Sequence, residues 1–205
     1  MAQFLEGFIR LVAPTRCVGC EELCSAAFCD ACESLIEPAS TPGAVFQYGG
    51  PIADAVHRFK YRGDSALSRP LGSLMGQAAS RWREDIDAVV PGPLHWRRRR
   101  WRGYDQAALL AKSAAGSLHV RALVRGLRRV RHTPSQIDLP HRERHRNVAG
   151  AFAPHHLEGA RRVLLVDDVR TTGATLQAAS KALRAGGVSE VRSLVLAARV
   201  ISDGT

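Results

Sequence analysis

Two hydrophobic patterns alternate along this chain, and together they predict an α/β fold. Short apolar runs, typical of buried strands, occur at Ala44, Asp87, Val120, Val163 and Val191. The region that begins at Val120 fits either a strand or a helix. Between the runs, apolar residues recur every three or four positions, as in helices with one buried face. These helical stretches are 52–59, 67–82, 105–118 and 176–185. We expect a mainly parallel sheet of about five strands flanked by helices.

The run at residues 163–166 is followed by the most informative stretch of the chain. It ends on two adjacent carboxylates, Asp167 and Asp168, and a turn rich in Thr and Gly leads into the helical stretch at 176–185. We expect the strand to stop at the acidic pair. A strand, a polar turn and a helix N-terminus predict a site at the carboxyl end of a strand, where open α/β sheets bind ligands.

This turn has the chemistry of a phosphate site. Backbone N–H groups at a helix N-terminus attract anions, hydroxyls add donors, and a glycine lets the backbone come close. The residues expected to cradle the phosphate are Thr171, Thr172, Gly173, Ala174 and Thr175. Asp167 and Asp168 would repel a phosphate, so they suit sugar hydroxyls or a cation beside it. A phosphate next to a diol describes a ribose 5-phosphate; the alternative is a solvated acidic pair before an ordinary helix cap.

Residues 163–175 resemble the 5-phosphoribosyl-1-pyrophosphate (PRPP) motif of type I phosphoribosyltransferases, in which four apolar residues precede two acidic ones and a Thr-Thr-Gly-x-Thr loop. The resemblance implies that Asp167 and Asp168 hold the ribose hydroxyls. It also implies that residues 171–175 hold the 5-phosphate. The motif specifies the phosphoribosyl donor and leaves the acceptor open.

The cysteines of the chain all lie between residues 17 and 32. Two C-x-x-C pairs are separated by eight residues, and they consist of Cys17, Cys20, Cys29 and Cys32. Paired knuckles of this kind predict a closed, structural zinc site with four thiolate ligands. A disulfide would need an exported chain and a redox motif would follow a strand, and the sequence offers neither. Cys24, between the pairs, could be a substitute ligand.

Composition indicates a domain boundary and a strongly basic chain. A Pro-, Ser- and Gly-containing linker at residues 37–43 divides a zinc-knuckle segment, 1–40, from a main domain, 41–205. The net charge is +10, which favours polyanions such as nucleic acid or phosphorylated small molecules, although an arginine bias can also reflect GC-rich coding. No apolar run has the length of a membrane span and no signal peptide is recognisable, so we expect a cytoplasmic protein.

A second anion site is expected after the strand that begins at Asp87. Pro91, Gly92 and Pro93 form a fixed turn, at the place where phosphoribosyltransferases hold pyrophosphate. Five of the six residues at 97–102 are arginines, which repel one another unless an anion joins them. That anion could be pyrophosphate or a nucleic-acid backbone.

Taken together, these pieces resemble the ComF family of competence-associated, phosphoribosyltransferase-like proteins over nearly the whole chain. The matching pieces are the cysteine knuckles, 59–63, the Pro-x-Pro turn, the Arg-Gly-aromatic-x-Gln piece at 102–106, the Thr-Pro-Ser-Gln segment at 133–136 and residues 144–152. Three positions depart from the family pattern: Gly92 stands where Val is usual, Asp105 where Asn is usual, and Asp138 where Gly is frequent.

The resemblance implies a phosphoribosyltransferase-type reaction, in which an acceptor displaces pyrophosphate from PRPP with the help of Mg²⁺. Asp167, Asp168 and Arg102 would be the catalytic residues, and Lys60 and Gln106 would join the turn at 91–93 in binding substrate. The alternative is a non-catalytic PRPP-sensing or docking module, which acts with single-stranded DNA and a helicase-like competence protein. A nuclease that uses the acidic pair is a third, weaker hypothesis.

Overall fold

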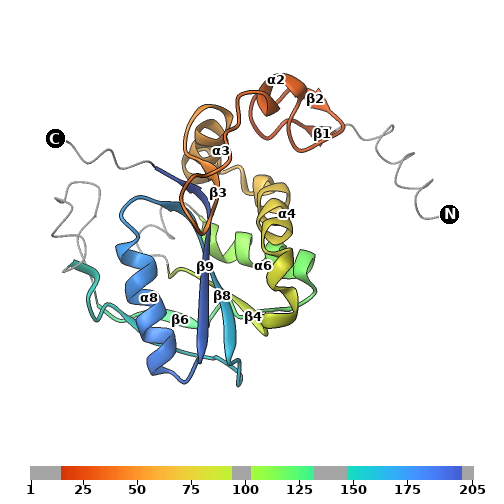
Figure 1. Cartoon of the computed structure of the whole chain (residues 1–205). Coiled ribbons are helices and arrows are strands. Elements are labelled where there is room, and N and C mark those ends of the chain that lie inside the picture. Colours follow the sequence, from red (N-terminus) through yellow and green to blue (C-terminus); the bar gives the residue numbers. More distant parts are fainter. Residues whose placement is uncertain (1–14, 94–102, 132–146, 200–205) are drawn as a thin grey trace.

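The computed structural model describes residues 15–93, 103–131 and 147–199. At its centre is a five-stranded sheet in the order β3-β9-β8-β4-β5, and all its strand pairs are parallel (Figure 1). The strands are β3 (Ala44–Gln47), β9 (Glu190–Ala198), β8 (Arg162–Arg170), β4 (Ala88–Pro91) and β5 (Arg121–Ala122). The expected α/β sheet of about five strands is confirmed, and each of the five apolar runs contributes one strand.

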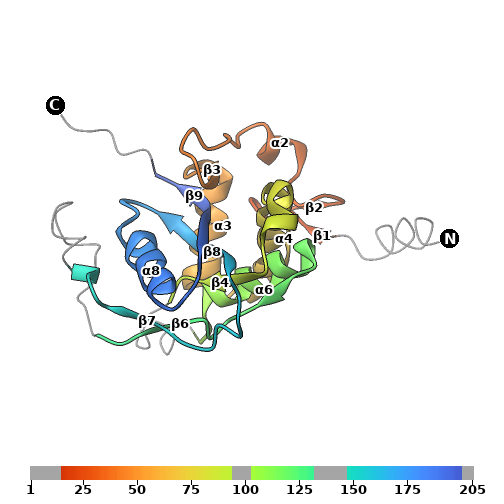
Figure 2. The same cartoon turned by 60° about the horizontal axis from the view of Figure 1, so that its bottom comes forward.

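Helices cover one face of the sheet, and a helix with a small second sheet covers the other (Figures 1 and 2). The first face carries α3 (Gly50–Tyr61), α4 (Ser68–Ala78) and α6 (Gln106–Leu118), together with the short 3₁₀ turns η1 (Ser65–Leu67) and η2 (Ser80–Asp85). The second face carries α8 (Ala174–Ala185) and the antiparallel pair β6 (Leu127–Arg129) and β7 (Phe152–Pro154). The sequence did not predict this second sheet. Trp82, expected in a helix, lies in η2.

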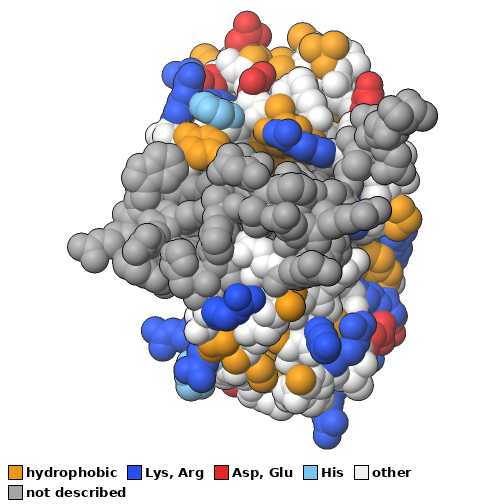
Figure 3. Space-filling model, turned by 90° about the vertical axis from the view of Figure 1, so that its left-hand side faces the viewer, with side chains coloured by type: hydrophobic (Ala, Val, Ile, Leu, Met, Phe, Trp, Pro, Cys, Tyr) orange, Lys and Arg blue, Asp and Glu red, His pale blue; other side chains and the backbone are white. Residues whose placement is uncertain are grey.

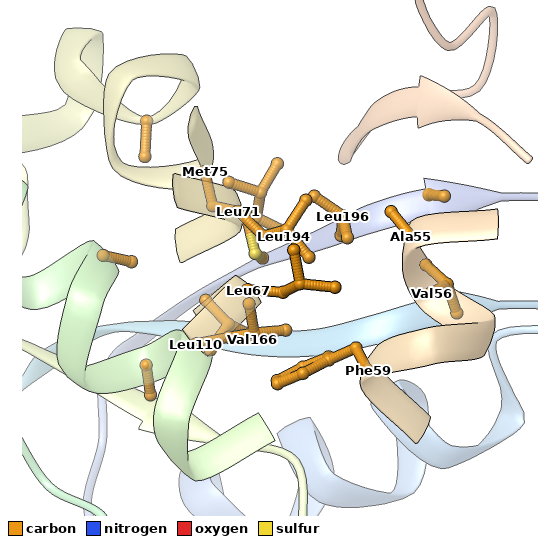
Figure 4. Close-up of a cluster of buried hydrophobic side chains, with 14 of the residues drawn as sticks. Ala55, Val56, Phe59, Leu67, Leu71, Met75, Leu110, Val166, Leu194 and Leu196 are labelled. Atoms are coloured by element: carbon orange, nitrogen blue, oxygen red, sulfur yellow. The ribbon is translucent and has the colours of Figure 1, made fainter. Parts of the chain in front are cut away.

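Strand β8 is buried on both faces, which explains its unbroken apolar run. Leu164 and Val166 belong to the core under α3, α4 and α6, whereas Val163 and Leu165 belong to the core under α8. Figure 4 shows Val166 within the first core, which also contains Phe59 of α3. Side chains alternate between the two faces of a strand, so this register also decides which way the acidic residues at the end of β8 point.

Helices α4 and α6 pack in close contact, because α4 presents glycines to α6. A Cβ added at Gly72 would lie 2.4 Å from the Cβ of Ser113, and one added at Gly76 would lie 2.5 Å from the Cβ of Ser117. Two glycines one helical turn apart therefore form a groove that receives α6. This packing fixes where α6 begins, close to the carboxyl edge of the sheet.

The amino-terminal segment folds as a compact knuckle against α3. It contains β1 (Thr15–Arg16), β2 (Leu23–Cys24) and the short helix α2 (Asp30–Glu33). Cys17 and Val18 are almost completely buried and share the core of the first sheet face. In the expected linker, the Ala39 amide donates to the Val45 carbonyl of β3. The boundary between segments 1–40 and 41–205 stays a prediction.

Within the described residues, no helix combines the length and the apolar character needed to cross a membrane.

Candidate functional site at the carboxyl edge of the sheet

The acidic pair lies inside strand β8 and does not end it. The expectation that the strand stops at Val166 is wrong, because β9 pairs with β8 as far as Arg170. Asp167 and Asp168 therefore belong to an extended strand and point to opposite faces of the sheet. Asp168 has the register of Val166 and points towards the α3 face, and Asp167 has the register of Leu165.

Asp168 forms an ion pair with Lys60, the residue singled out at the basic end of α3. Lys60 Nζ lies 2.9 Å from Asp168 Oδ1, and the two side chains are 16% and 13% exposed. The same carboxylate oxygen accepts a hydrogen bond from the Val169 amide at 2.6 Å. The pair thus joins the end of α3 to the end of β8 and leaves both charges within reach of a ligand at the sheet edge.

Asp167 points towards the turn after β4, where Gly92 has no side chain that would block its carboxylate. A Cβ on Gly92 would lie only 2.9 Å from Asp167 Oδ2, so the glycine lets the carboxylate approach that turn. Asp167 Oδ1 accepts a hydrogen bond from the Asp168 amide at 2.9 Å. Burial, with added repulsion from Asp168, raises the pKa of Asp167 to about 7; the Asp168 amide and Lys60 act in the opposite direction.

The turn at residues 91–93 continues β4 and is already engaged with β8. Pro91 pairs with Val166 in the sheet, and the Gly92 amide donates to the Val166 carbonyl at 2.7 Å. Prolines carry no N–H group, so the single backbone donor of Pro91, Gly92 and Pro93 is used inside the fold. Gly92 contributes close approach to Asp167, and pyrophosphate binding by this turn stays a prediction.

The loop after β8 places a helix N-terminus beside the acidic pair. Gly173 has φ +77°, a value that favours glycine, and it caps α8, which begins at Ala174, two residues earlier than expected. Thr171 is exposed, Thr172 and Thr175 are half-buried, and the side chain of Ala174 is buried. Ala174 would therefore offer a ligand only its backbone amide, which now donates to Thr172 Oγ1 at 3.4 Å. The first amides of a helix lack partners within the helix, which suits an anion here.

Gln106 is 1% exposed and lies under the site. Its Nε2 donates to the Phe59 carbonyl at 3.4 Å, and the hydroxyl of Tyr104 donates to the same carbonyl. Phe59 immediately precedes Lys60, so both donors hold the end of the helix that carries the lysine. The sequence had placed Gln106 among the substrate-binding residues and had assigned no role to Tyr104, although both belong to the Arg-Gly-aromatic-x-Gln piece.

Asp105, a departure from the family pattern, caps helix α6. Its Oδ1 accepts a hydrogen bond from the Ala108 amide at 3.0 Å. Asp and Asn serve almost equally well as N-caps, so the departure from the family pattern keeps the cap of α6. The charge also reaches the site, since it is a minor cause of the raised pKa of Asp167. The charges of Asp168, Lys60 and Asp105 therefore all act on the carboxylate of Asp167.

The four cysteines of the two knuckles converge as the sequence predicted. The sulfur atoms of Cys17, Cys20, Cys29 and Cys32 all lie within 4.8 Å of one another. Zinc binds thiolates at about 2.3 Å in a tetrahedron, and this sulfur cluster is compact enough for such a site. The fifth thiol, Cys24, is outside the cluster and contacts the Ala26 carbonyl at 3.0 Å. Four cysteines in this arrangement could bind zinc.

Electrostatics within the cluster favour a thiolate at one position. Burial raises the pKa of the Cys17 thiol, but backbone hydrogen bonds outweigh burial and lower it to about 6; the amide of Cys29 is one donor, at 3.3 Å. Burial raises the pKa of Cys32. A cation that binds all four sulfurs would supply the charge that the remaining thiols need in order to ionise.

Arg102 and the arginines at 97–100 lie outside the described residues, as does the Thr-Pro-Ser-Gln segment, so their predicted roles stay predictions. Arg58, by contrast, is a residue that sequence reasoning missed. It is 7% exposed and contacts the first knuckle. No local pattern marked it, because Arg58 is not three or four residues from the apolar positions at 52, 53, 56 and 59; its burial comes with its contacts to the knuckle.

A parallel sheet with helices on both faces, and an acidic pair followed by a Thr-Gly loop at its carboxyl edge, define a type I phosphoribosyltransferase-like fold. A family model described as "Phosphoribosyl transferase domain" matches residues 126–203, which include β8, the loop and α8.

Comparison with curated proteins makes the assignment more specific. The chain is similar to Competence protein F of Haemophilus influenzae, with 35% identity over 153 residues that cover 71% of this chain and 67% of the relative. It is 31% identical to DNA utilization protein YhgH of Salmonella typhi over 170 residues, which cover 80% and 74%. It is 27% identical to Competence protein ComFC of Streptococcus pneumoniae over 153 residues, which cover 75% and 66%. The chain belongs to the ComF family.

Proposed function

We propose that this protein binds PRPP at the carboxyl edge of the sheet and transfers its phosphoribosyl group to an acceptor, with release of pyrophosphate. The observation that carries the proposal is the Lys60–Asp168 ion pair beside the Thr-Gly loop. It puts an ammonium group, carboxylates and helix amides at one edge, which are the groups that pyrophosphate, ribose hydroxyls and a 5-phosphate respectively require.

Each group would have a distinct role. The amides and hydroxyls of residues 171–175 hold the 5-phosphate, and Asp167 and Asp168 accept hydrogen bonds from the ribose hydroxyls. Lys60 leaves Asp168 to neutralise pyrophosphate, and Arg102 adds charge to the same group. A Mg²⁺ ion that arrives with PRPP would supply charge neutralisation at these oxygens.

The transfer itself would need little acid–base chemistry, because pyrophosphate is an activated leaving group. The bond from C1 to pyrophosphate oxygen breaks, the leaving group keeps the electron pair, and the acceptor nucleophile forms the new bond to C1 and loses its proton. Fixed positions of the 5-phosphate and the pyrophosphate would orient C1 towards the acceptor. The acceptor is the part of the reaction that the motif leaves open.

Calorimetric titration with PRPP and Mg²⁺ tests the proposal. The wild-type chain should bind, and Asp167→Asn and Asp168→Asn should each weaken binding about tenfold or more, the effect of losing a hydrogen bond made to a charged group. Asp54→Asn is the matched control, because Asp54 is an exposed carboxylate on α3, and it should bind like the wild type. No binding by the wild-type chain, or equal affinity in all three variants, would contradict the proposal. Pyrophosphate release with a panel of bases and amines then separates an enzyme from a sensor.

A second function, a PRPP-responsive docking module for single-stranded DNA, is favoured by charge. Residues 106–131 contain six Lys and Arg residues and no acid, and Arg125, Arg128 and Arg131 are exposed. Figure 3 shows Lys and Arg side chains above and below the atoms drawn in grey. Relatives are named for competence and for DNA utilization, which fits this role, and a helicase-like competence protein would be the partner.

Binding of single-stranded DNA should then fall steeply with salt, and neutralising the arginines at 97–100 should reduce both affinity and salt slope. Affinity that does not change with salt would exclude this second function.

A further inference from the structure

The last turn of α3 connects the cysteine knuckle to the proposed PRPP site. Arg58 and Lys60 lie two residues apart on it, and their side chains go to different partners. Lys60 reaches Asp168 of β8, whereas Arg58 reaches back to the loop between the first two knuckle cysteines. Figure 4 shows Ala55, Val56 and Phe59 of the same helix within the core that α3 shares with β8 and β9.

Arg58 contacts the knuckle through several bonds at once. Its Nη2 donates to the carbonyls of Val18 and Gly19, the latter at 3.3 Å, and its Nη1 lies 3.1 Å from Glu21 Oε1. The guanidinium is buried, and within the described residues its Nε has no hydrogen-bond partner. A buried charge held by loop carbonyls is costly to release, so the position of the loop and the position of α3 are coupled.

The opposite side of the same turn is also fixed. Phe59 is fully buried, and its carbonyl accepts hydrogen bonds from Tyr104 and Gln106 at the start of α6. Helices leave their last carbonyls without helical partners, so these donors satisfy a group that the end of α3 would otherwise leave open. Lys60 follows directly, held between an anchor on the knuckle and an anchor on α6.

We infer that Arg58 is a positioning residue through which the cysteine knuckle sets the place of Lys60 opposite Asp168. The knuckle is then a part of the site's architecture. The inference rests on the proposed function only in calling the Lys60–Asp168 pair a part of the PRPP site.

The lysines of the chain provide a direct test without any ligand. There are three, and the other two, Lys112 on α6 and Lys181 on α8, are exposed. Brief acylation with acetic anhydride, followed by mass spectrometry, gives the rate at Lys60 relative to these internal standards. The ion pair and burial should make Lys60 slow in the wild-type chain.

In Arg58→Met the relative rate at Lys60 should rise about threefold or more, the scale of coupling between residues that share a backbone shift. Arg58→Lys should recover a part of the protection, because one ammonium cannot replace a fork of donors. Arg162→Met is the matched control: Arg162 also bridges segments, with Nη2 at 2.9 Å from Asp87 Oδ1, but at the other end of β8.

An unchanged Lys60 rate in folded Arg58 variants, or an equal rise in Arg162→Met, would overturn the inference. Glu21→Gln serves if Arg58→Met does not fold, because Glu21 is half exposed and only the ion pair is lost; a smaller rise is expected there, and no rise counts against the inference. PRPP affinity should fall in the same order as Lys60 protection. A wild-type chain that fails to bind PRPP refutes the proposed function and leaves the acylation result to decide the inference.

Discussion

Removal of the Lys60 ammonium in Lys60→Met should reveal how strongly the ion pair couples α3 to β8. Two unit charges at 2.9 Å attract by about 6 kcal/mol at an effective dielectric constant of about 20. Removing two charges from water costs several kcal/mol, and both side chains keep some exposure, so we expect a net coupling of about 1–2 kcal/mol.

The assay is a double-mutant cycle of urea unfolding with Lys60→Met, Asp168→Asn and the double variant. Lys112→Met controls for the loss of an exposed lysine from a helix and should be nearly neutral. Strictly additive effects of the two substitutions would refute the reasoning, because they would mean that the ammonium and the carboxylate do not interact in solution.

Lys60→Met should also alter the pH dependence of the free energy of unfolding. The native pKa of Asp167, about 7, exceeds the ordinary value of about 3.9, so the native state holds more protons than the unfolded state between these limits. Stability contributed by this group is complete below about pH 4 and is lost as the pH rises towards 7. Lys60 lowers the pKa of Asp167, so in Lys60→Met the loss should extend to higher pH; unfolding free energies measured from pH 5 to 9 would show it.

Three further predictions concern the rest of the fold. Gly72→Ala should destabilise the protein by about 1–3 kcal/mol in urea unfolding, since the new Cβ would lie 2.4 Å from the Cβ of Ser113; a neutral result would mean that α4 and α6 are not in close contact. Asp87→Asn should reduce the loss of stability at acid pH. Hydrogen bonds from two backbone amides lower the pKa of Asp87, so the stability that this carboxylate contributes is lost as the pH falls below about 4. An equal loss of stability at acid pH in the variant and in the wild type would argue against this. Metal analysis should find about one zinc per chain in Cys24→Ser and much less in Cys20→Ser, and equal losses in both would place Cys24 among the ligands.

The sequence predicted the strands and helix ends that depend only on neighbouring residues in the chain. The unbroken apolar run before Asp167 gave a strand buried on both faces, and the helical spacing with Gly186 gave the end of α8. The continuation of β8 could not be predicted, because residues 167–170 are polar or mixed and stay extended through pairing with β9. Strand β7 was missed, and β6 lies in the region after Val120 that fits either a strand or a helix; the two strands have three residues each and depend on one another.

In the site, the sequence indicated candidate residues but did not show which of them lie together. Composition and spacing singled out Lys60, Asp168 and the Thr-Gly loop, but no local pattern could place an α3 residue against β8. Gln106 was assigned to the substrate, and the structure places it beneath Lys60. The bond from Gln106 to the Phe59 carbonyl joins residues that are 47 positions apart, so the sequence could not show it, and a role of Gln106 in substrate binding stays a prediction.

A crystal structure of the full chain with PRPP and Mg²⁺ would test directly whether PRPP binds at the carboxyl edge of the sheet. We expect the 5-phosphate at the N-terminus of α8, within about 3 Å of backbone amides of residues 172–175, and the ribose hydroxyls at Asp167 and Asp168. Lys60 should have left Asp168 for the pyrophosphate. A 5-phosphate bound away from α8, or a Lys60–Asp168 pair that persists while pyrophosphate binds elsewhere, would contradict the proposed PRPP site.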